Sequence, residues 1–266
     1  MIDPLMFIAL LPAVVLVVYI CRKDRTDKEP PALIAKLLGY GVLSCLPAIV
    51  VELILSAIIE RLNVRNVYLG YFLEAFVVAG LTEETCKFLF LRTTWRNPAF
   101  DYQFDAIVYA VMVALGFAAF ENVKYVYSYG FATGIVRAVT AVPGHAIFGV
   151  FMGYFYGYAK LSDYWGRDDD RKAYLALSVV VPVLMHGCYD FLAFTQESDS
   201  RFTLLFYAYL VALYVFGIRR VNRSSRDDRR VTRETVFDYF RRMQYPMPPQ
   251  YLSLIHISEP TRLALI

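Results

Sequence analysis

The stretch Leu81-Thr82-Glu83-Glu84-Thr85-Cys86-Lys87 interrupts an apolar run, from about Tyr68 to Trp95, that is otherwise long enough to span a bilayer. Charges at membrane depth are costly, so two adjacent carboxylates and a lysine are expected to face a polar interior. On a helix, Glu83, Glu84 and Lys87 share one face, because residues three and four apart are neighbours. The alternative is the solvated start of a helix, with the acids in its first turn.

The composition indicates a polytopic helical membrane protein. Of the 266 residues, 58% are hydrophobic and 19% are charged, and the apolar residues come in long blocks. We therefore expect an all-α transmembrane bundle in the cell membrane, with the lipid bilayer and not nucleic acid as its partner. The expected spans, about seven in number, are residues 5–20, 33–59, 68–95, 105–127, 134–158, 173–194 and 202–218. Four scattered cysteines support neither a disulfide framework nor a thiolate zinc site.

Lys and Arg residues are concentrated in alternate loops. They follow the first, third and fifth expected spans, and the chain carries seven arginines between residues 219 and 233. The intervening loops are poorer, and the arginines counted there are Arg61, Arg65, Arg137 and Arg201. The positive-inside rule predicts that the N-terminus is outside and the C-terminus is cytoplasmic.

One membrane-embedded domain is expected over residues 1–220, because no connection is long enough to hold a folded domain outside the bilayer. Residues 221–251 are expected to form an Arg- and Pro-rich cytoplasmic tail. Residues 252–266 resemble a translated sequencing adapter joined to a truncated reading frame, so they are excluded from the fold prediction. This exclusion sets His256 aside and leaves two histidines.

Three later spans bring further polar groups to a similar depth. Glu121 lies in the outer half of the fourth span, His145 follows a proline–glycine pair in the fifth, and His186 and Asp190 share a face of the sixth. Glu52 in the second span is the main other intramembrane acid, and nothing near it in the sequence indicates chemistry. We expect one shared site from the following residues: Glu83, Glu84, Glu121, His145, His186 and Asp190.

This ordered set resembles the PrsW family of intramembrane proteases, itself similar to the larger group of CAAX prenyl endopeptidases and bacteriocin-processing proteins. The matching positions are Glu83-Glu84-x-x-Lys87, Phe120-Glu121-x-x-x-Tyr125, His145 with Phe148, and His186-x-x-x-Asp190. The resemblance implies an endopeptidase that cuts membrane-anchored proteins such as anti-sigma factors. The wider group usually has asparagine where this chain has Asp190, so an amide oxyanion donor is not carried over.

Peptide hydrolysis needs an activated water, a group that stabilises the oxyanion and a proton for the leaving amine. Glu83 or Glu84 is the expected general base, His145 would help to hold the water, and His186 would face the oxyanion. The acids expected to orient the two imidazoles are Glu121 and Asp190. Because the outer ends of the fourth and sixth spans carry these acids, we expect the cut near the extracytoplasmic face.

Two alternatives stay open on the sequence alone. Glu84, His145 and His186 are suitable ligands for a catalytic zinc with water in the fourth position, although no His-Glu-x-x-His helix supports zinc. A metal-free glutamate mechanism is equally consistent with these residues. Buried acids and histidines also build proton relays, so an ion-coupled transporter or channel is the alternative function.

Overall fold

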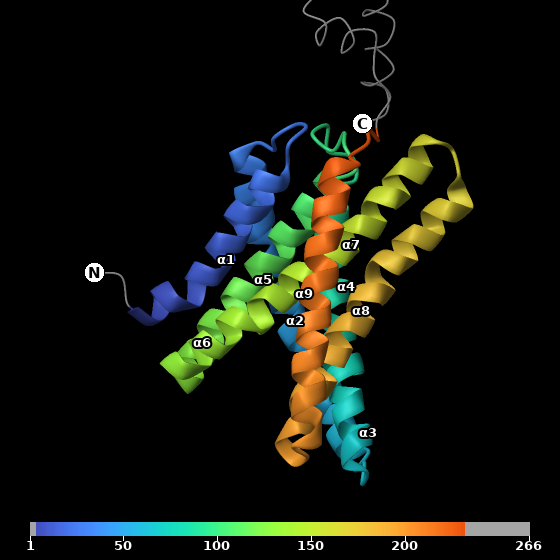
Figure 1. Cartoon of the computed structure of the whole chain (residues 1–266). Helices are drawn as coiled ribbons and strands as arrows, with labels where there is room; N and C mark the ends of the chain where they lie inside the picture. Colours follow the sequence, from blue (N-terminus) through green and yellow to red (C-terminus); the bar gives the residue numbers. More distant parts are fainter. Residues whose placement is uncertain (1–3, 232–266) are drawn as a thin grey trace, which may run out of the picture. The chain divides into compact units, whose positions relative to one another are not determined.

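A computed structural model describes residues 4–231, and over that range the chain is helical, with no strand beyond an isolated bridge between Tyr102 and Arg230. The elements are α1 (Pro4–Lys23), α2 (Pro31–Arg61), α3 (Val67–Phe72), the π-helical segment η1 (Leu73–Leu81), α4 (Thr82–Leu91), the 3-10 turn η2 (Arg92–Thr94), α5 (Asp105–Tyr129), α6 (Phe131–Val139), α7 (Ala141–Tyr164), α8 (Asp168–Ser198) and α9 (Arg201–Arg226) (Figure 1). The predicted all-α fold is confirmed for this part of the chain. The expected tail beyond residue 231 and the adapter-like residues 252–266 lie outside the described residues.

Helices α5 and α7 form the centre of the bundle, and glycines let their backbones approach closely. A Cβ atom on Gly153 of α7 would lie 2.4 Å from the Ala106 carbonyl oxygen of α5. On the other side of α5, a Cβ on Gly116 would lie 2.0 Å from the Leu38 carbonyl oxygen of α2. Small residues at such contacts are typical of membrane helices, which associate by close packing. Helix α5 is the most enclosed long helix, with 78% of its most apolar window buried.

Six helical stretches are long and apolar enough to cross a membrane, and these are residues 5–23, 31–61, 105–129, 131–164, 168–196 and 201–226. The other expected span, residues 68–95, is a composite helix in which α3, η1, α4 and η2 follow one another without a break. Its central π-helical segment is nine residues long. Such wide turns are rare and occur frequently at functional sites.

The region of the expected fifth span, residues 134–158, is divided between two helices. Helix α5 ends at Gly130, whose φ of 88° is accessible to glycine and reverses the chain. The short helix α6 then runs back along α1 and α5, and a second break at Thr140 separates it from α7. The expected span of residues 134–158 thus lies within the apolar stretch 131–164, which is broken at Thr140, and α7 starts at Ala141.

The end of α9 is attached to the loop before α5. Helix α9 continues to Arg226, so the expected domain boundary at residue 220 falls inside a helix. Beyond it, the backbone of Val231 donates to the carbonyl oxygen of Asp101 at 2.7 Å, and that of Gln103 donates to Arg229 at 2.8 Å. Residues 221–231 thus belong to the packed bundle.

Candidate active site

The Glu-Glu-x-x-Lys stretch lies at the start of α4 and is buried. The exposed fractions are 6% for Glu83, 0% for Glu84 and 1% for Lys87. Leu81 has helical backbone angles, so the chain enters α4 directly from η1 and Thr82 is not a helix cap. The alternative of a solvated helix start is therefore wrong.

Close packing between η1 and α8 brings His186 to this cluster. A Cβ atom on Gly187 would lie only 2.3 Å from the Phe76 ring, and one on Gly80 would lie 3.2 Å from the Gly187 nitrogen. Only glycine permits this approach without a shift of the neighbouring atoms. The residue next to Gly187 is thereby held against the buried glutamates.

Lys87 connects the two glutamates to His145. Its Nζ donates to Glu84 Oε1 at 2.8 Å and to Glu83 Oε2 at 3.0 Å, and it lies 3.1 Å from His145 Nδ1. The ammonium also lies 3.9 Å from the centre of the Phe117 ring, a cation–π distance. An ammonium can only donate, so Nδ1 of His145 accepts.

The other nitrogen of His145 must then carry the proton. His145 Nε2 lies 3.0 Å from Glu121 Oε2, which also accepts from Arg137 Nη2 at 2.7 Å. Arg137 is fixed in turn by a hydrogen bond from Nε to Asn122 Oδ1 at 3.1 Å and by the Tyr125 ring beneath its guanidinium. His145 is therefore a neutral imidazole whose tautomer follows from Lys87 on one side and Glu121 on the other.

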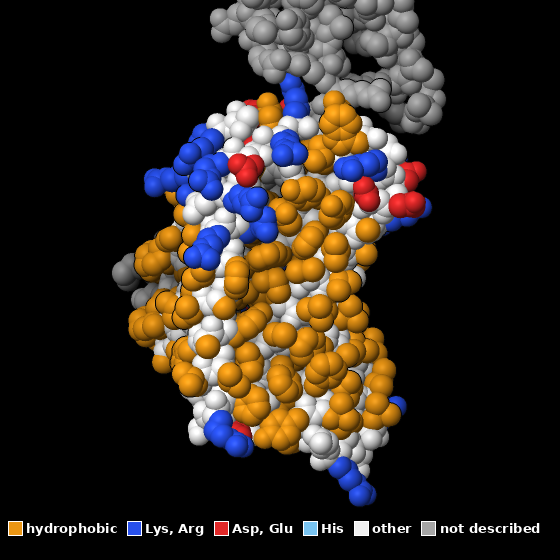
Figure 2. Space-filling model, turned by 45° about the vertical axis from the view of Figure 1, so that its right-hand side comes forward, with side chains coloured by type: hydrophobic (Ala, Val, Ile, Leu, Met, Phe, Trp, Pro, Cys, Tyr) orange, Lys and Arg blue, Asp and Glu red, His pale blue; other side chains and the backbone are white. Residues whose placement is uncertain are grey.

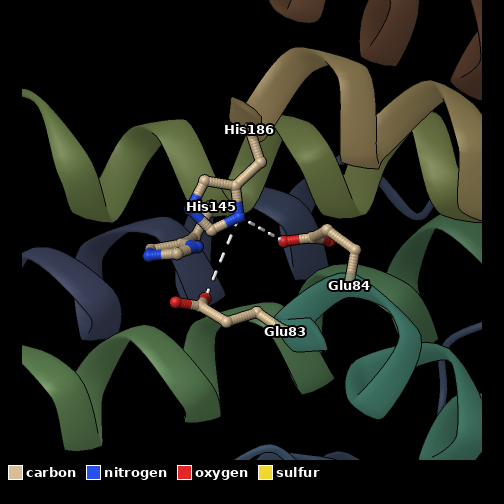
Figure 3. Close-up of side chains that lie close together, drawn as sticks. All are labelled: Glu83, Glu84, His145 and His186. Atoms are coloured by element: carbon tan, nitrogen blue, oxygen red, sulfur yellow. Dashed lines mark hydrogen bonds and ion pairs between the residues drawn. The ribbon is translucent and has the colours of Figure 1, made fainter. Parts of the chain in front are cut away.

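His186 has acids at both nitrogens. Its Nδ1 lies 3.0 Å from Glu84 Oε1 and 3.9 Å from Glu83 Oε2 (Figure 3). Its Nε2 lies 3.2 Å from Asp190 Oδ2. Ionised carboxylates only accept, so His186 donates from both nitrogens as an imidazolium unless one of these acids is protonated. Its ring stacks on Phe148 with centroids 5.0 Å apart.

A cavity of about 570 Å³ adjoins the cluster. Five of the six expected site residues line it, namely Glu83, Glu121, His145, His186 and Asp190. Glu84 does not line it, because this side chain is fully buried behind the contacts to Lys87 and His186. The structure thus brings all six residues together but places the two glutamates differently.

Two residues of this cavity were missed in the sequence. Glu52 of α2 lines the cavity, and among the described residues no hydrogen bond or ion pair satisfies its carboxylate. Arg137 was counted as a loop charge, yet it lines the cavity and binds Glu121. The sequence contains one indication of the position of Arg137, which is Gly130. A chain reversal at Gly130 places residue 137 beside residues 121–125, because they lie at similar sequence separations from the turn.

The residues fit a metal ion in identity and in spacing. One donor atom from each of Glu83, Glu84, His145 and His186 lies within 4.8 Å of the others. Imidazole nitrogens and carboxylate oxygens are common zinc ligands, and Glu84 Oε2 is buried without a hydrogen-bond partner. In this arrangement, a metal ion would compete with the Lys87 ammonium for Glu84 Oε1 and His145 Nδ1.

Comparisons with known proteins identify the family of this chain. The PrsW family intramembrane metalloproteases match residues 29–218. The protease PrsW of Bacillus subtilis is 34% identical over 214 residues, which cover 80% of this chain and 92% of that protein. The protease PrsW of Oceanobacillus iheyensis is 35% identical over 80% of this chain and 93% of its own length. The Clostridioides difficile protein of that name is 28% identical over 85% and 94%.

No solved structure matches the chain. The family match covers most of the sequence and includes the four segments that carry the buried acids and histidines. This match favours a peptidase over the transporter alternative. The long apolar helices make the protein a multi-pass membrane protein. The chain belongs to the PrsW family of intramembrane proteases.

Proposed function

We propose that this membrane peptidase hydrolyses a peptide bond of a membrane-anchored protein in the cavity lined by Glu83, His145 and His186. The observation that carries the proposal is the group of four buried donor residues within 4.8 Å of one another beside a cavity of about 570 Å³. Such a cavity has room for a peptide segment and a water molecule. Convergent titratable groups in a concave site are typical of an active site.

Glu83 is the better candidate for the general base. It lines the cavity, whereas Glu84 is turned inward and holds both Lys87 and His186. A general base must reach the proton that it removes directly or through one water, and of the two glutamates in α4 only Glu83 lines the cavity. Glu83 would take a proton from the attacking water and pass it to the leaving amine.

In a metal-free mechanism, His186 is the candidate for the oxyanion donor, because its imidazolium can donate from both nitrogens. Its N–H groups are paired with carboxylates in this structure, so one bond must open when a carbonyl oxygen arrives. The bond to Asp190 is the longer one, at 3.2 Å, and Asp190 lies at the cavity wall. Donors aimed at the developing oxyanion are often the largest single contribution to catalysis.

The ligands proposed for a metal are Glu84, His145 and His186, which sequence and structure both support as donors. When bound, the ion would supply Lewis-acid polarisation of the substrate carbonyl. Glu83 would still act on the water from the cavity side. A metal-free mechanism would instead use Lys87 and the His186 imidazolium as the positive charges of the site.

We propose seven spans, with the composite helix of residues 67–94 as the third, the N-terminus outside and the C-terminus in the cytoplasm. The alternating Lys and Arg residues of the loops support this orientation. The cavity is lined by Ser56 near the end of α2 and Gln196 near the end of α8, both at the proposed outer side. Access from there supports cleavage near the extracytoplasmic face.

The proposed substrates are anti-sigma factors and similar proteins with one membrane span, a class that comes from the resemblance to the PrsW family. The expected relation to the CAAX endopeptidase and bacteriocin-processing group stays a prediction. Neither the substrate class nor the relation to the wider group changes the roles proposed for Glu83 and His186.

The test is co-expression of this chain with single-span substrates, comparing wild type with Glu83→Gln and Glu84→Gln. Glu60→Gln is the matched control, since Glu60 is exposed near the end of α2. We expect cleavage by wild type and the control only. Mass spectrometry of the new termini should locate the cut at the outer side, and a cytoplasmic cut would overturn the topology or the access route. Full activity after complete zinc removal would exclude the metal role.

A further inference from the structure

Two further cavities lie between α1 and α9, away from the peptidase cavity. The first is an apolar groove of about 170 Å³. Helix α1 contributes Leu16 and Ile20, helix α9 contributes Ile218 and Val221, and α7 forms the floor with Ile147. No charged side chain lines this groove. Its apolar lining is suited to a hydrocarbon chain.

The second cavity, of about 570 Å³, is strongly cationic. Its charged lining residues are Lys23, Arg25, Arg219, Arg223 and Arg226, and no acid lines it. Arg223 pairs with Asp227 at 3.5 Å. In the described part of the chain, no carboxylate pairs with Arg25, Arg219 or Arg226 within 4.0 Å. Three guanidinium groups are therefore left for an anion.

The two cavities adjoin along the same helix faces. On α1, Leu16, Ile20 and Lys23 follow one another at helical spacing, so the apolar face ends in a cation. Across the gap, Lys23 Nζ donates to Asn222 Oδ1 at 2.6 Å, one residue beyond Val221. The side chain of Ser225 also donates to the Lys23 carbonyl. These bonds mark the boundary at which the groove changes from apolar to cationic.

We propose that this site between α1 and α9 binds one anionic glycerophospholipid. Its phosphate would occupy the cationic cavity and an acyl chain would occupy the apolar groove. Figure 2 shows the corresponding pattern on the face it presents, with Lys and Arg side chains gathered at one end of a broad hydrophobic band. Basic pockets between membrane helices on the cytoplasmic side are suited to anionic headgroups.

The alternative is a charge cluster that only fixes the topology. The start of α8 provides the comparison, because its cations also lie at the proposed cytoplasmic side. There Arg171 pairs with Asp168 at 3.1 Å, and Lys172 pairs with Asp169 at 3.7 Å. These two cations therefore have carboxylate partners within the protein. Topology alone does not account for unpaired arginines beside a groove between two helices.

Binding of the purified full chain to dioleoyl phosphatidylglycerol, measured by native mass spectrometry, tests the proposal. Dioleoyl phosphatidylcholine, deacylated glycerophosphoglycerol and inorganic phosphate are the comparison probes. We expect phosphatidylglycerol to bind most tightly. The double variant Arg219→Gln/Arg226→Gln should weaken it about fivefold for each charge removed, or roughly 25-fold. Arg171→Gln/Lys172→Gln should leave its affinity unchanged.

A variant of the groove separates the acyl chain from the phosphate. Ile218→Asn changes an exposed lining residue, so the fold should survive, and a thermal melt without lipid checks this. We expect weaker phosphatidylglycerol binding and unchanged phosphate binding. Equal binding of the two phospholipids, or equal loss in both double variants, would overturn the proposal. If glycerophosphoglycerol or inorganic phosphate bound as tightly as phosphatidylglycerol, the site would bind phosphate without an acyl chain, and the lipid proposal would be overturned. None of these readouts depends on peptidase activity.

Discussion

His145 and His186 are equally buried, at 3% exposed, and their rings lie 5.1 Å apart, yet their partners give them opposite hydrogen-bonding roles. His145 accepts from Lys87 and donates to Glu121. His186 lies between two acids and donates from both nitrogens when both carboxylates are ionised. Burial alone therefore does not decide what a histidine can do in this site. The charges at the two ring nitrogens decide it: His145 has an ammonium at one nitrogen and a carboxylate at the other, whereas His186 has a carboxylate at each.

The difference has a structural origin. His145 belongs to α7, within the close-packed centre of the bundle, and its partner Glu121 is held by Arg137 from α6. His186 belongs to α8, which is held against η1 by the approach at Gly187. One imidazole is thus fixed by an ion-pair chain, and the other has a carboxylate at the cavity wall that a substrate could displace.

The largest effect is expected at Glu83, which lines the cavity together with His145 and His186. Glu83→Gln keeps the shape and removes the base, so the cleavage rate should fall by about 10²–10⁴-fold, the range for general acid–base catalysis. A single-turnover assay with a defined substrate measures this. Glu60→Gln controls for loss of one glutamate, and a fall of less than tenfold for Glu83→Gln would contradict its role as the base.

The two histidines can be compared directly. His186→Gln should lower the rate by about 10²–10³-fold, as expected for loss of an oxyanion donor. In a metal-free mechanism, His145→Gln should lower it much less, because His145 then only holds water. Rates and zinc content are measured for both variants. Equal losses of rate together with equal losses of zinc would show that both rings are metal ligands and would remove the asymmetry.

Much of this comparison could be predicted from local spacing. The shared faces of Glu83 with Lys87 and of His186 with Asp190 follow from helical periodicity, and the ion pairs between them are present. Similar depth in successive spans was enough to predict that these residues converge. The common requirement is a regular helix on which spacing determines the face.

The rest depends on the path of the backbone over long distances. The π-helical turns before Glu83 change the rotation per residue, so the inward orientation of Glu84 does not follow from a regular period. The reversal at Gly130 brings Arg137 to Glu121, although the hydropathy pattern assigned Arg137 to a loop. Glu52 faces the cavity because of how α2 packs, and no local pattern contains that information.

Lys87 causes the difference in hydrogen bonding between His145 and His186, because it donates to His145. The variant Lys87→Met should therefore reduce this difference. The change leaves Glu83 and Glu84 buried without their counter-ion, which costs about 3–5 kcal/mol when one partner of a buried pair is removed. We expect a lower melting temperature that zinc partly restores, because the ion would take the place of the ammonium. Thermal melts and zinc titration of both proteins measure this. Identical zinc affinities for wild type and Lys87→Met would contradict the proposed competition.

Arg137→Gln should have a smaller effect, because Arg137 acts on His145 through Glu121. Loss of the guanidinium frees Glu121 to rotate, and we expect a roughly tenfold lower rate, in line with loss of outer contacts that orient a site. Arg137→Lys should recover part of the lost cleavage rate. Nitrogen NMR of His145 in Arg137→Gln should report a changed tautomer population. Arg201→Gln is the control, since Arg201 pairs with Asp199 at the turn between α8 and α9. An unchanged spectrum would contradict the positioning role.

The smallest effect concerns Glu29, whose titration must be separated from that of the two histidines in any pH profile. Glu29 lies between α1 and α2, outside the spans; Tyr109 donates to its Oε1 at 2.8 Å and its Oε2 is buried without a partner. Burial raises the pKa of Glu29 from 4.5 to about 7. The folded state therefore binds a proton that the unfolded state has released, and stability should fall as pH rises from about 4.5 to 7.

We expect this loss to be about 1–2 kcal/mol in the free energy of unfolding, less than a full burial shift gives because the side chain is partly exposed. Glu29→Gln cannot ionise, so its melting temperature should vary less between pH 5 and pH 8. The cleavage rate per folded molecule should be unchanged, since Glu29 lies outside the peptidase cavity. If Glu29→Gln instead moves the pH profile of the rate, the profile of the wild type cannot be assigned to His145 and His186 alone.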